Sequence, residues 1–444
     1  MSNRFFPSIT APIAYEGPAT ANPLAFRWYD AKRVIAGKTM AEHLRFAVCY
    51  WHTFCGTGSD PFGGPSYERA WHLASDPLVR AEQTLEAAFE FFSKLGAPYW
   101  CFHDRDIAPE GANQAESAKN LAHIVAKAGV LQRETGIKLL WGTANLFSHQ
   151  RYNHGASTNP DPLVFAHGAA QVRRALDATI ALGGTGYVFW GGREGYSMLL
   201  NTDQAQERKQ YATLLRMAIT YARANGFTGR FFIEPKPKEP SVHQYDSDVA
   251  GVLGFLREFD LWQDVDINVE ANHATLAGHS FEHELQTASA VGKLGSIDVN
   301  RGNPLLGWDT DQFPTDVPSA VMAMLVVRAQ GGLTHGGLNF DAKVRRGSTD
   351  PVDLFHGHIG GMDTFARGLL IAERMRADGF PEKGIATRYA GWREGLGAKI
   401  LAGKATLEEA ETWARTAGEP ELRSGREELL ENRFNQYLDD STIR

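Results

Sequence analysis

The 444-residue sequence predicts an α/β protein built on a closed (β/α)8 TIM barrel. Short β-rich runs alternate with longer segments of helical apolar spacing eight times, which is typical of a parallel sheet. Residues suited to chemistry lie at nearly every strand end, as in barrel enzymes, whereas an open sheet gathers its ligands near one switch point. A doubly wound open sheet stays the structural alternative, because periodicity cannot show closure.

The predicted strands are Phe46–Trp51, Tyr99–His103, Lys138–Thr143, Gly186–Trp190, Gly229–Glu234, Asp266–Glu270, Ser296–Asn300 and Gly337–Phe340. Helical spacing is clear in the segments between them, for example over residues 80–92 and 169–180. We expect residues 45–386 to form this catalytic barrel.

The segments on either side of the barrel have a different composition. Residues 1–44 are rich in proline and aromatic residues and predict an N-terminal extension packed on the barrel surface. Residues 387–444 predict an extended helical C-terminal arm for subunit contacts, because their few apolar residues could not form a core alone. Within the arm, Thr406–Asp440 is charged and helical, and Thr406 and Glu409 have the spacing of a capping box.

Composition and charge exclude several function classes. The net charge of −7 argues against nucleic acid or anionic lipid as the main partner. Cys49, Cys55 and Cys101 form a sparse, odd set, which favours reduced thiols in a cytoplasmic protein over a disulfide framework. The sequence has neither the apolar core of a signal peptide nor a run of about 18 apolar residues, so no membrane segment is expected.

Seven candidate metal ligands lie at strand ends or in the loops that follow them. Six carboxylates need neutralisation, since two unit charges about 4 Å apart repel by roughly 4 kcal/mol at an effective dielectric near 20. Neighbouring lysines and arginines are too few, so we expect divalent cations, with Mg²⁺ preferred and Mn²⁺ or Co²⁺ as alternatives. Seven ligands exceed the roughly six that one Mg²⁺ takes, which favours two ions per subunit. One such aspartate alone would suggest only a helix N-cap or an ion pair. The seven are Glu234, Glu270, His273, Asp298, Asp309, Asp311 and Asp341.

Residues suited to a sugar ligand accompany this cluster. His103 and Asp106 lie three apart at the second strand's tip, and an imidazole held by a carboxylate can move a hydroxyl proton. A purely structural hydrogen bond is the alternative. Trp51, Phe147 and Trp190 lie at or just past the first, third and fourth strand ends, where aromatic faces could pack against a sugar or serve as core.

Together these motifs resemble the xylose isomerase family, and the N-terminal extension resembles its larger, class II form. The similarity runs in unbroken order from about Phe46 to Met375. The matching runs are Tyr50–Cys55, Trp100–Asp104, Trp141–Asn145, Phe189–Gly195, Ile233–Pro240, Glu270–His279, Asn300–Gly302, Gly307–Phe313 and Gly336–Arg346.

The resemblance assigns roles to the candidate residues. It implies one metal site at Glu234, Glu270, Asp298 and Asp341, and a second at Glu270, His273, Asp309 and Asp311, with Glu270 bridging. His103, supported by Asp106, would assist opening of the pyranose ring, and Lys236 would bind the oxygen on C1. Phe62, in the loop Asp60–Gly63, would enter a neighbouring subunit's site in a homo-oligomer, typically a tetramer.

The resemblance also implies the reaction, which is conversion of D-xylose to D-xylulose, and of D-glucose to D-fructose, by a two-metal-assisted hydride shift between C2 and C1. A related barrel isomerase or epimerase using enediolate proton transfer is the main alternative. A divalent-metal hydrolase fits less well, since such sites use several histidines and this cluster has one imidazole. A catalytically inactive sugar-binding protein is disfavoured because every expected catalytic position is filled.

Overall fold

The computed structural model describes residues 4–439, and residues 1–3 of the predicted extension and 440–444 of the predicted arm lie outside the described residues. Eight parallel strands close into a barrel in which each strand pairs with the next along the chain and the last pairs with the first. The predicted fold class is confirmed, and the open sheet is excluded. The strands are β5 (Phe46–Cys49), β6 (Tyr99–His103), β7 (Lys138–Thr143), β8 (Gly186–Trp190), β10 (Arg230–Glu234), β12 (Val265–Glu270), β13 (Leu294–Asp298) and β14 (Leu338–Phe340).

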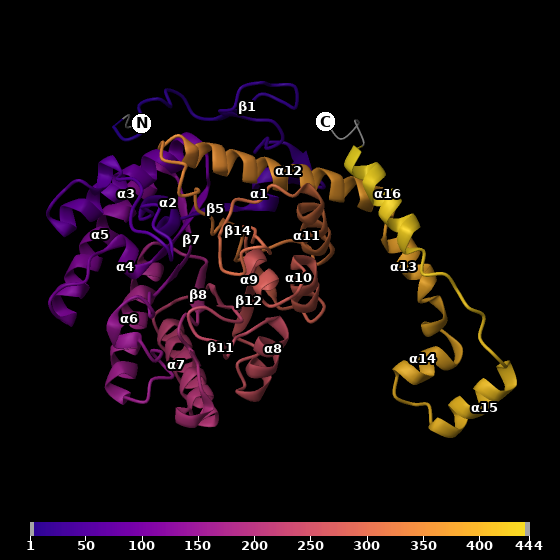
Figure 1. Ribbon diagram of the computed structural model, residues 1–444. Helices are drawn as coiled ribbons and strands as arrows, with labels where there is room; N and C mark the ends of the chain where they lie inside the picture. Colours follow the sequence, from indigo (N-terminus) through magenta and orange to yellow (C-terminus); the bar gives the residue numbers. More distant parts are fainter. Residues whose placement is uncertain (1–3, 440–444) are drawn as a thin grey trace.

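One principal helix follows each strand, and these helices surround the barrel (Figure 1). Their ends follow local chemistry: Asp76 caps α3 by accepting from the N–H groups of Leu78 and Val79, and Gly96 ends it with a left-handed φ of 79°. The helices are α3 (Pro77–Leu95), α5 (Gln114–Thr135), α6 (Pro162–Ala181), α7 (Gln204–Ala224), α8 (Val249–Glu258), α10 (Phe281–Ser289), α11 (Val317–Ala329) and α12 (Asp353–Asp378).

The prediction that the first strand extends to Trp51 is wrong. Strand β5 ends at Cys49, and the next residues form a short helix, α2 (Tyr50–Phe54). The apolar run from Phe46 onward has no periodicity that separates a buried strand from a helical turn. Strand β13 also lies two residues earlier than predicted. Two further short helices begin directly at strand tips, α4 (Asp104–Ile107) and α9 (Ala271–Leu276), and with α2 they form part of the barrel's mouth.

Large side chains fill the barrel's interior below that mouth. Phe232 is fully buried there, and it is accommodated by glycines on two other strands. A Cβ atom on Gly186 or Gly295 would lie only 2.6 or 2.3 Å from the Phe232 ring. Trp141 and Val188 belong to the same buried cluster. The barrel is therefore a packed support for the residues at its mouth.

The N-terminal extension lies on the barrel surface and also contributes buried side chains to the core. Phe6 is buried, with its ring centroid 5.4 Å from that of Trp71 and 5.3 Å from that of Phe355. Asp363 of α12 accepts hydrogen bonds of 2.8 Å from three successive backbone N–H groups, those of residues 27–29. The helices and strands of the N-terminal extension are β1 (Ala14–Tyr15), β2 (Ala25–Phe26), β3 (Val34–Ile35), β4 (Lys38–Thr39) and α1 (Met40–Leu44).

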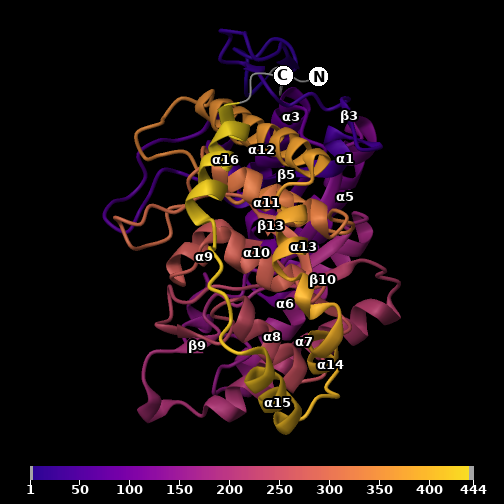
Figure 2. The ribbon, with the colours of Figure 1, turned by 90° about the vertical axis from the view of Figure 1, so that its right-hand side faces the viewer.

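The C-terminal arm extends away from the barrel before its last helix returns to α12 (Figures 1 and 2). The capping box of Thr406 and Glu409 is confirmed at the start of α15. The region predicted as helical from residue 406 onward is two helices, because Gly418 ends the first with a φ of 73°. Tyr437 stacks on Phe380 and donates a 3.0 Å hydrogen bond to Asp378. The helices are α13 (Glu382–Arg388), α14 (Gly395–Leu401), α15 (Leu407–Ala417) and α16 (Glu427–Asp439).

Two short strands, β9 (Gly195–Tyr196) and β11 (His243–Gln244), pair antiparallel outside the barrel. Across residues 4–439, every helix is too short or too polar to cross a membrane.

Candidate active site

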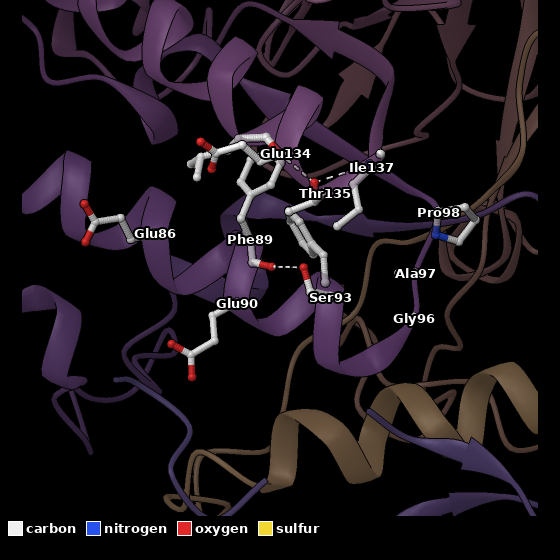
Figure 3. Close-up of a pocket in the computed structure, with 13 residues that line it drawn as sticks. Glu86, Phe89, Glu90, Ser93, Gly96, Ala97, Pro98, Glu134, Thr135 and Ile137 are labelled. Carbon is white, nitrogen blue, oxygen red and sulfur yellow. Dashed lines mark hydrogen bonds between the residues drawn. The ribbon is translucent and has the colours of Figure 1, made fainter. Parts of the chain in front are cut away.

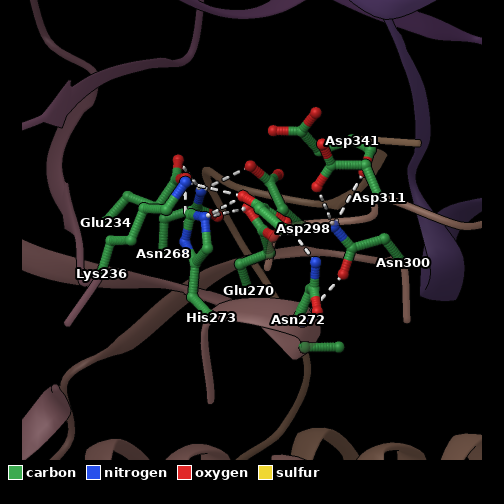
Figure 4. Close-up of polar contacts among 12 residues, drawn as sticks. Glu234, Lys236, Asn268, Glu270, Asn272, His273, Asp298, Asn300, Asp311 and Asp341 are labelled. Atoms are coloured by element: carbon green, nitrogen blue, oxygen red, sulfur yellow. Dashed lines mark hydrogen bonds and ion pairs between the residues drawn. The ribbon is translucent and has the colours of Figure 1, made fainter. Parts of the chain in front are cut away.

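The structure brings all seven predicted metal ligands together at the carboxyl end of the barrel, and Figure 4 labels all of them except Asp309. Glu234, Glu270 and Asp298 are the last residues of β10, β12 and β13, and Asp341 follows β14 directly. Parallel strands in a barrel end at the same rim, which explains why residues so far apart in sequence converge. His273 is carried by α9, and Asp309 and Asp311 by the loop between β13 and α11.

Four carboxylates form a first group, in which one oxygen of each lies within 4.8 Å of the others. Asparagines on neighbouring strands orient them: the amide of Asn268 donates 3.0 Å hydrogen bonds to both Glu234 and Asp298, and Asn339 donates a third to Asp298. These amides fix the carboxylates without neutralising their charge. The group consists of Glu234, Glu270, Asp298 and Asp341.

A second group overlaps the first. Oxygens of Glu270, Asp309 and Asp311 also lie within 4.8 Å of one another. His273 forms a further group with Glu234 and Glu270, and its Nε2 atom is 3.2 Å from both Glu270 and Asp309. Glu270 therefore belongs to both groups, as the predicted bridging role requires, and the amide of Asn300 holds its other oxygen at 2.7 Å.

Three members of the first group have raised pKa values, whereas contacts with His52 and Trp51 outweigh burial and lower the pKa of Asp341. Burial, together with the charge of Asp298, raises the pKa of Glu234 well above its usual range. Burial and the charge of Asp309 do the same to the pKa of Glu270. Burial and the charge of Asp341 raise the pKa of Asp298 to about 8. In the metal-free protein these groups retain protons that an incoming cation would displace.

Three basic side chains neutralise part of the cluster. Lys236 pairs with Asp309 at 2.7 Å, and Lys343 pairs with Asp311 at 2.9 Å. His52 lies 3.1 Å from both Asp311 and Asp341, and although burial opposes its charge, these two partners raise its pKa to about 9. The sequence prediction missed His52 and Lys343, although one follows Trp51 directly and the other lies two residues after Asp341. Six carboxylates still outnumber the three bases.

The donor set suits divalent cations. Clustered carboxylate oxygens bind Mg²⁺ and Mn²⁺, and the imidazole of His273 beside them extends the range to Co²⁺. The buried acidic and histidine cluster is thus compatible with metal binding.

An aromatic cavity of about 170 Å³ opens onto the cluster, and Trp51, Phe147 and Trp190 all line it. The indole N–H of Trp51 donates a 2.8 Å hydrogen bond to Asp341. The rings of Phe147 and Trp190 meet edge to face with centroids 4.4 Å apart. Trp141, Thr143 and Val188, which the sequence prediction missed, also line the cavity because they face the barrel interior.

His103 enters this cavity with its proposed partner behind it. Its Nδ1 atom is 2.7 Å from the Asp106 carboxylate, and its ring centroid is 4.3 Å from that of Trp51. We assign the Nδ1 proton to this hydrogen bond, which leaves Nε2 able to accept a proton from a ligand.

The predicted site residue Phe62 lies outside the aromatic cavity of its own chain. Its side chain is 80% exposed, and its ring packs beside Trp308 with centroids 5.4 Å apart.

A larger hollow of about 720 Å³ lies between α3 and α5 (Figure 3). Pro98 and Ile137, which line it, directly precede β6 and β7, so this hollow is at the opposite, amino end of the strands. Its charged lining consists of Glu86, Glu90 and Glu134. Glu90 binds the backbone N–H groups of the N-terminal extension, and Lys127 pairs with Glu86. Barrel enzymes place their active sites at the carboxyl ends of the strands, which favours the mouth over this hollow as the active site.

The shifted pKa values predict how pH affects the metal-free protein. Asp298 binds its proton more tightly when folded, so its stabilising contribution is complete below about pH 4 and is lost as pH rises through about 8. The contribution of His52 is complete below about 6.5 and is lost as pH rises through about 9. We therefore expect the melting temperature of EDTA-treated protein to fall between pH 6.5 and 9, and to fall less with Mg²⁺ present. A metal-free melting temperature that rises over this range would contradict the electrostatics.

Comparisons with known proteins agree with this geometry. Residues 385–438 match a family model described as the XylA2 C-terminal domain. The chain is 58% identical to xylose isomerase 2 of Xanthomonas campestris pv. campestris (strain 8004) over 437 residues, covering 98% of each chain. It is 58% identical to xylose isomerase of Xanthomonas oryzae pv. oryzae (strain MAFF 311018) over 438 residues, again covering 98% of each. A solved structure of a protein from Rhodospirillum rubrum ATCC 11170 has a TM-score of 0.50 at 14% identity, covering 72% of this chain and 98% of that one, a likeness of fold alone.

Proposed function

Because the chain belongs to the xylose isomerase family, we propose that it interconverts D-xylose and D-xylulose, and also D-glucose and D-fructose, at the barrel mouth. The observation that carries this proposal is the pair of overlapping ligand groups that share Glu270 beside an aromatic cavity. We further propose that Glu234, Glu270, Asp298 and Asp341 hold one divalent ion and that Glu270, His273, Asp309 and Asp311 hold a second.

When bound, two such ions, Mg²⁺ or alternatively Mn²⁺ or Co²⁺, would act as Lewis acids on the sugar oxygens, which suits a hydride shift between C2 and C1. The chain's own residues prepare the sugar. His103, oriented by Asp106, accepts a hydroxyl proton as the pyranose ring opens. Trp51, Phe147 and Trp190 pack against the sugar's C–H faces and exclude water.

Lys236 serves as a fixed donor rather than a base. Burial opposes its charge, but the adjacent Asp309 carboxylate outweighs burial and raises the Lys236 pKa above its usual range. An ammonium held 2.7 Å from Asp309 can donate a hydrogen bond to the oxygen on C1 but cannot abstract a proton at neutral pH. This favours a hydride shift over an enediolate that needs a base beside C1 and C2.

Two measurements test the proposal. D-Xylose with the protein and Mg²⁺ should give D-xylulose, and absence of turnover would refute the assigned reaction. The same conversion in ²H₂O should leave C1 of the product almost free of deuterium. Substantial deuterium at C1 would favour the enediolate route instead.

We also propose that the protein is a cytoplasmic homotetramer in which Phe62 reaches a neighbouring subunit's site. The three described thiols are free, which suits a reducing compartment. Large apolar side chains stay exposed on the arm of a single chain, and a partner subunit would cover them. These include Tyr389, Trp392, Leu401, Trp413 and Leu429. Light scattering should give about four times the chain mass of 48.9 kDa.

Replacing Phe62 with alanine is expected to lower kcat/KM for D-xylose by about tenfold in the intact oligomer, because an apolar wall of the neighbouring site is lost. The exposed ring contributes little to its own chain's core, so the melting temperature should stay within about 2 °C. Leu163→Ala, another exposed apolar residue outside this loop, serves as the matched control. An F62A enzyme as active as wild type would contradict a shared site.

A further inference from the structure

A second cluster of imidazoles and carboxylates lies outside the barrel mouth, where the start of α10 meets the start of α8. Ligand atoms of His279, His283 and Glu284 all lie within 4.8 Å of one another. Asp248, the N-cap residue of α8, places a carboxylate oxygen 3.6 Å from Nε2 of His279. None of these four residues has a part in the proposed reaction.

Local structure aligns the two imidazoles. His279 and His283 are four residues apart across the first turn of α10, where Ser280 is the N-cap. Their ring centroids are 4.9 Å apart and the ring planes are tilted by 31°, so the two imidazoles lie side by side. Their side chains are 34% and 57% exposed, which leaves them accessible to an ion from solvent.

Backbone N–H groups hold the carboxylates of Glu284 and Asp248, and each carboxylate uses only one of its two oxygens for this. Glu284 is buried, and its Oε2 accepts a 2.7 Å hydrogen bond from the N–H of Val249 while Oε1 lies 4.0 Å from Nε2 of His283. Asp248 uses Oδ1 to cap the N–H of Gly251, and its Oδ2 faces His279. Each carboxylate therefore keeps one oxygen for a ligand.

We propose that His279, His283 and Glu284 bind a transition-metal ion such as Zn²⁺, with the Asp248 carboxylate beside His279. Two imidazoles with carboxylates are typical zinc ligands, whereas the ligands proposed at the barrel mouth are six carboxylates and one imidazole, which suit harder ions. Ligand atoms about 2.1 Å from a tetrahedral ion stand roughly 3.4 Å apart. The separations of 3.6 and 4.0 Å reach that value with small side-chain rotations.

An ion in this position would join two segments that support the active site. Asp248 ends the segment that follows β10 and carries Lys236, and His279 and His283 follow the short helix that carries His273. A small cavity lies between the two sites, and its lining includes Asp248 and Glu284 on one side and His273 on the other. Binding would therefore stabilise the barrel's mouth without entering the sugar cavity.

The test is a titration of ZnCl₂ into the protein kept in excess Mg²⁺, followed by calorimetry and metal analysis after dialysis. Wild type should bind one more Zn²⁺ per chain than the His279→Gln/His283→Gln double variant, and each single variant should weaken that binding at least tenfold. Zn²⁺ should raise the melting temperature of wild type by several degrees more than that of the double variant. His356→Gln, which removes an exposed histidine of α12, is the matched control and should bind like wild type.

Equal Zn²⁺ stoichiometry and affinity in wild type and double variant would overturn the proposal. Turnover of D-xylose with Mg²⁺ alone should be the same in both proteins. Failure of the zinc site is therefore distinguishable from failure of the proposed isomerase function.

Discussion

Removal of divalent ions with EDTA is expected to abolish D-xylose conversion, with at least a thousandfold loss, and added Mg²⁺, Mn²⁺ or Co²⁺ is expected to restore it. Without cations, the raised pKa values of Glu234, Glu270 and Asp298 leave the site partly protonated and without an electrophile. Loss of a single oxyanion-stabilising donor typically lowers the rate by about 10²–10³-fold. Chelation removes both proposed cations, each of which would stabilise negative charge on the sugar oxygens, so a larger loss is expected.

Substitution of Glu270, the ligand shared by both groups, tests whether the loss of activity comes from loss of the metal ions. Glu270→Gln should weaken metal binding in both groups and lower kcat by at least about 10³-fold, because Glu270 belongs to both. Asp266→Asn is the matched control, since Asp266 lies on the same strand, four residues earlier, and pairs with Arg230 and Lys293 instead. The Asp266→Asn variant should retain most of the wild-type activity when assayed at low temperature.

Circular dichroism before and after chelation separates loss of the ions from loss of the fold. Activity that survives in protein proven metal-free by elemental analysis would refute the metal-dependent mechanism.

The gathering of ligands at the mouth was predictable from sequence, because strand periodicity identifies the strand ends and a parallel barrel brings those ends to one rim. Glu234 and Glu270 end their strands both in the prediction and in the structure, whereas Asp298 lies two residues before the predicted end of its strand and is the last residue of β13. The capping box at Thr406 was also predictable, because it depends only on the spacing of two nearby residues.

Contacts that depend on how one segment turns over another were not predictable. His52 reaches Asp311 and Asp341 only because α2 begins at Tyr50, and the apolar run in this region does not distinguish strand from helix. Likewise, the return of α16 onto α12 rests on contacts such as Tyr437 with Asp378, which are 59 residues apart. No pattern within either helix specifies that pairing.

His103→Gln is expected to lower kcat for cyclic D-xylose by about 10²-fold or more while having much less effect on a substrate that needs no ring opening. The imidazole is fixed by its 2.7 Å hydrogen bond to Asp106, so Nε2 is directed to accept a hydroxyl proton, and such general-base groups contribute about 10²–10⁴ in rate. Glutamine has a similar length and can still donate to Asp106, but its amide does not accept a proton at neutral pH.

The comparison substrate is D-glyceraldehyde, which is too short to form a pyranose or furanose ring. The informative quantity is the ratio of variant to wild-type rate for each substrate, because this ratio cancels the poorer binding of the shorter sugar. Asp106→Asn should give a smaller loss with the same substrate dependence, since it misorients the imidazole without removing it. Equal losses on both sugars would contradict a role in ring opening and would instead assign His103 to the isomerisation step or to the shape of the cavity it shares with Trp51 and Phe147.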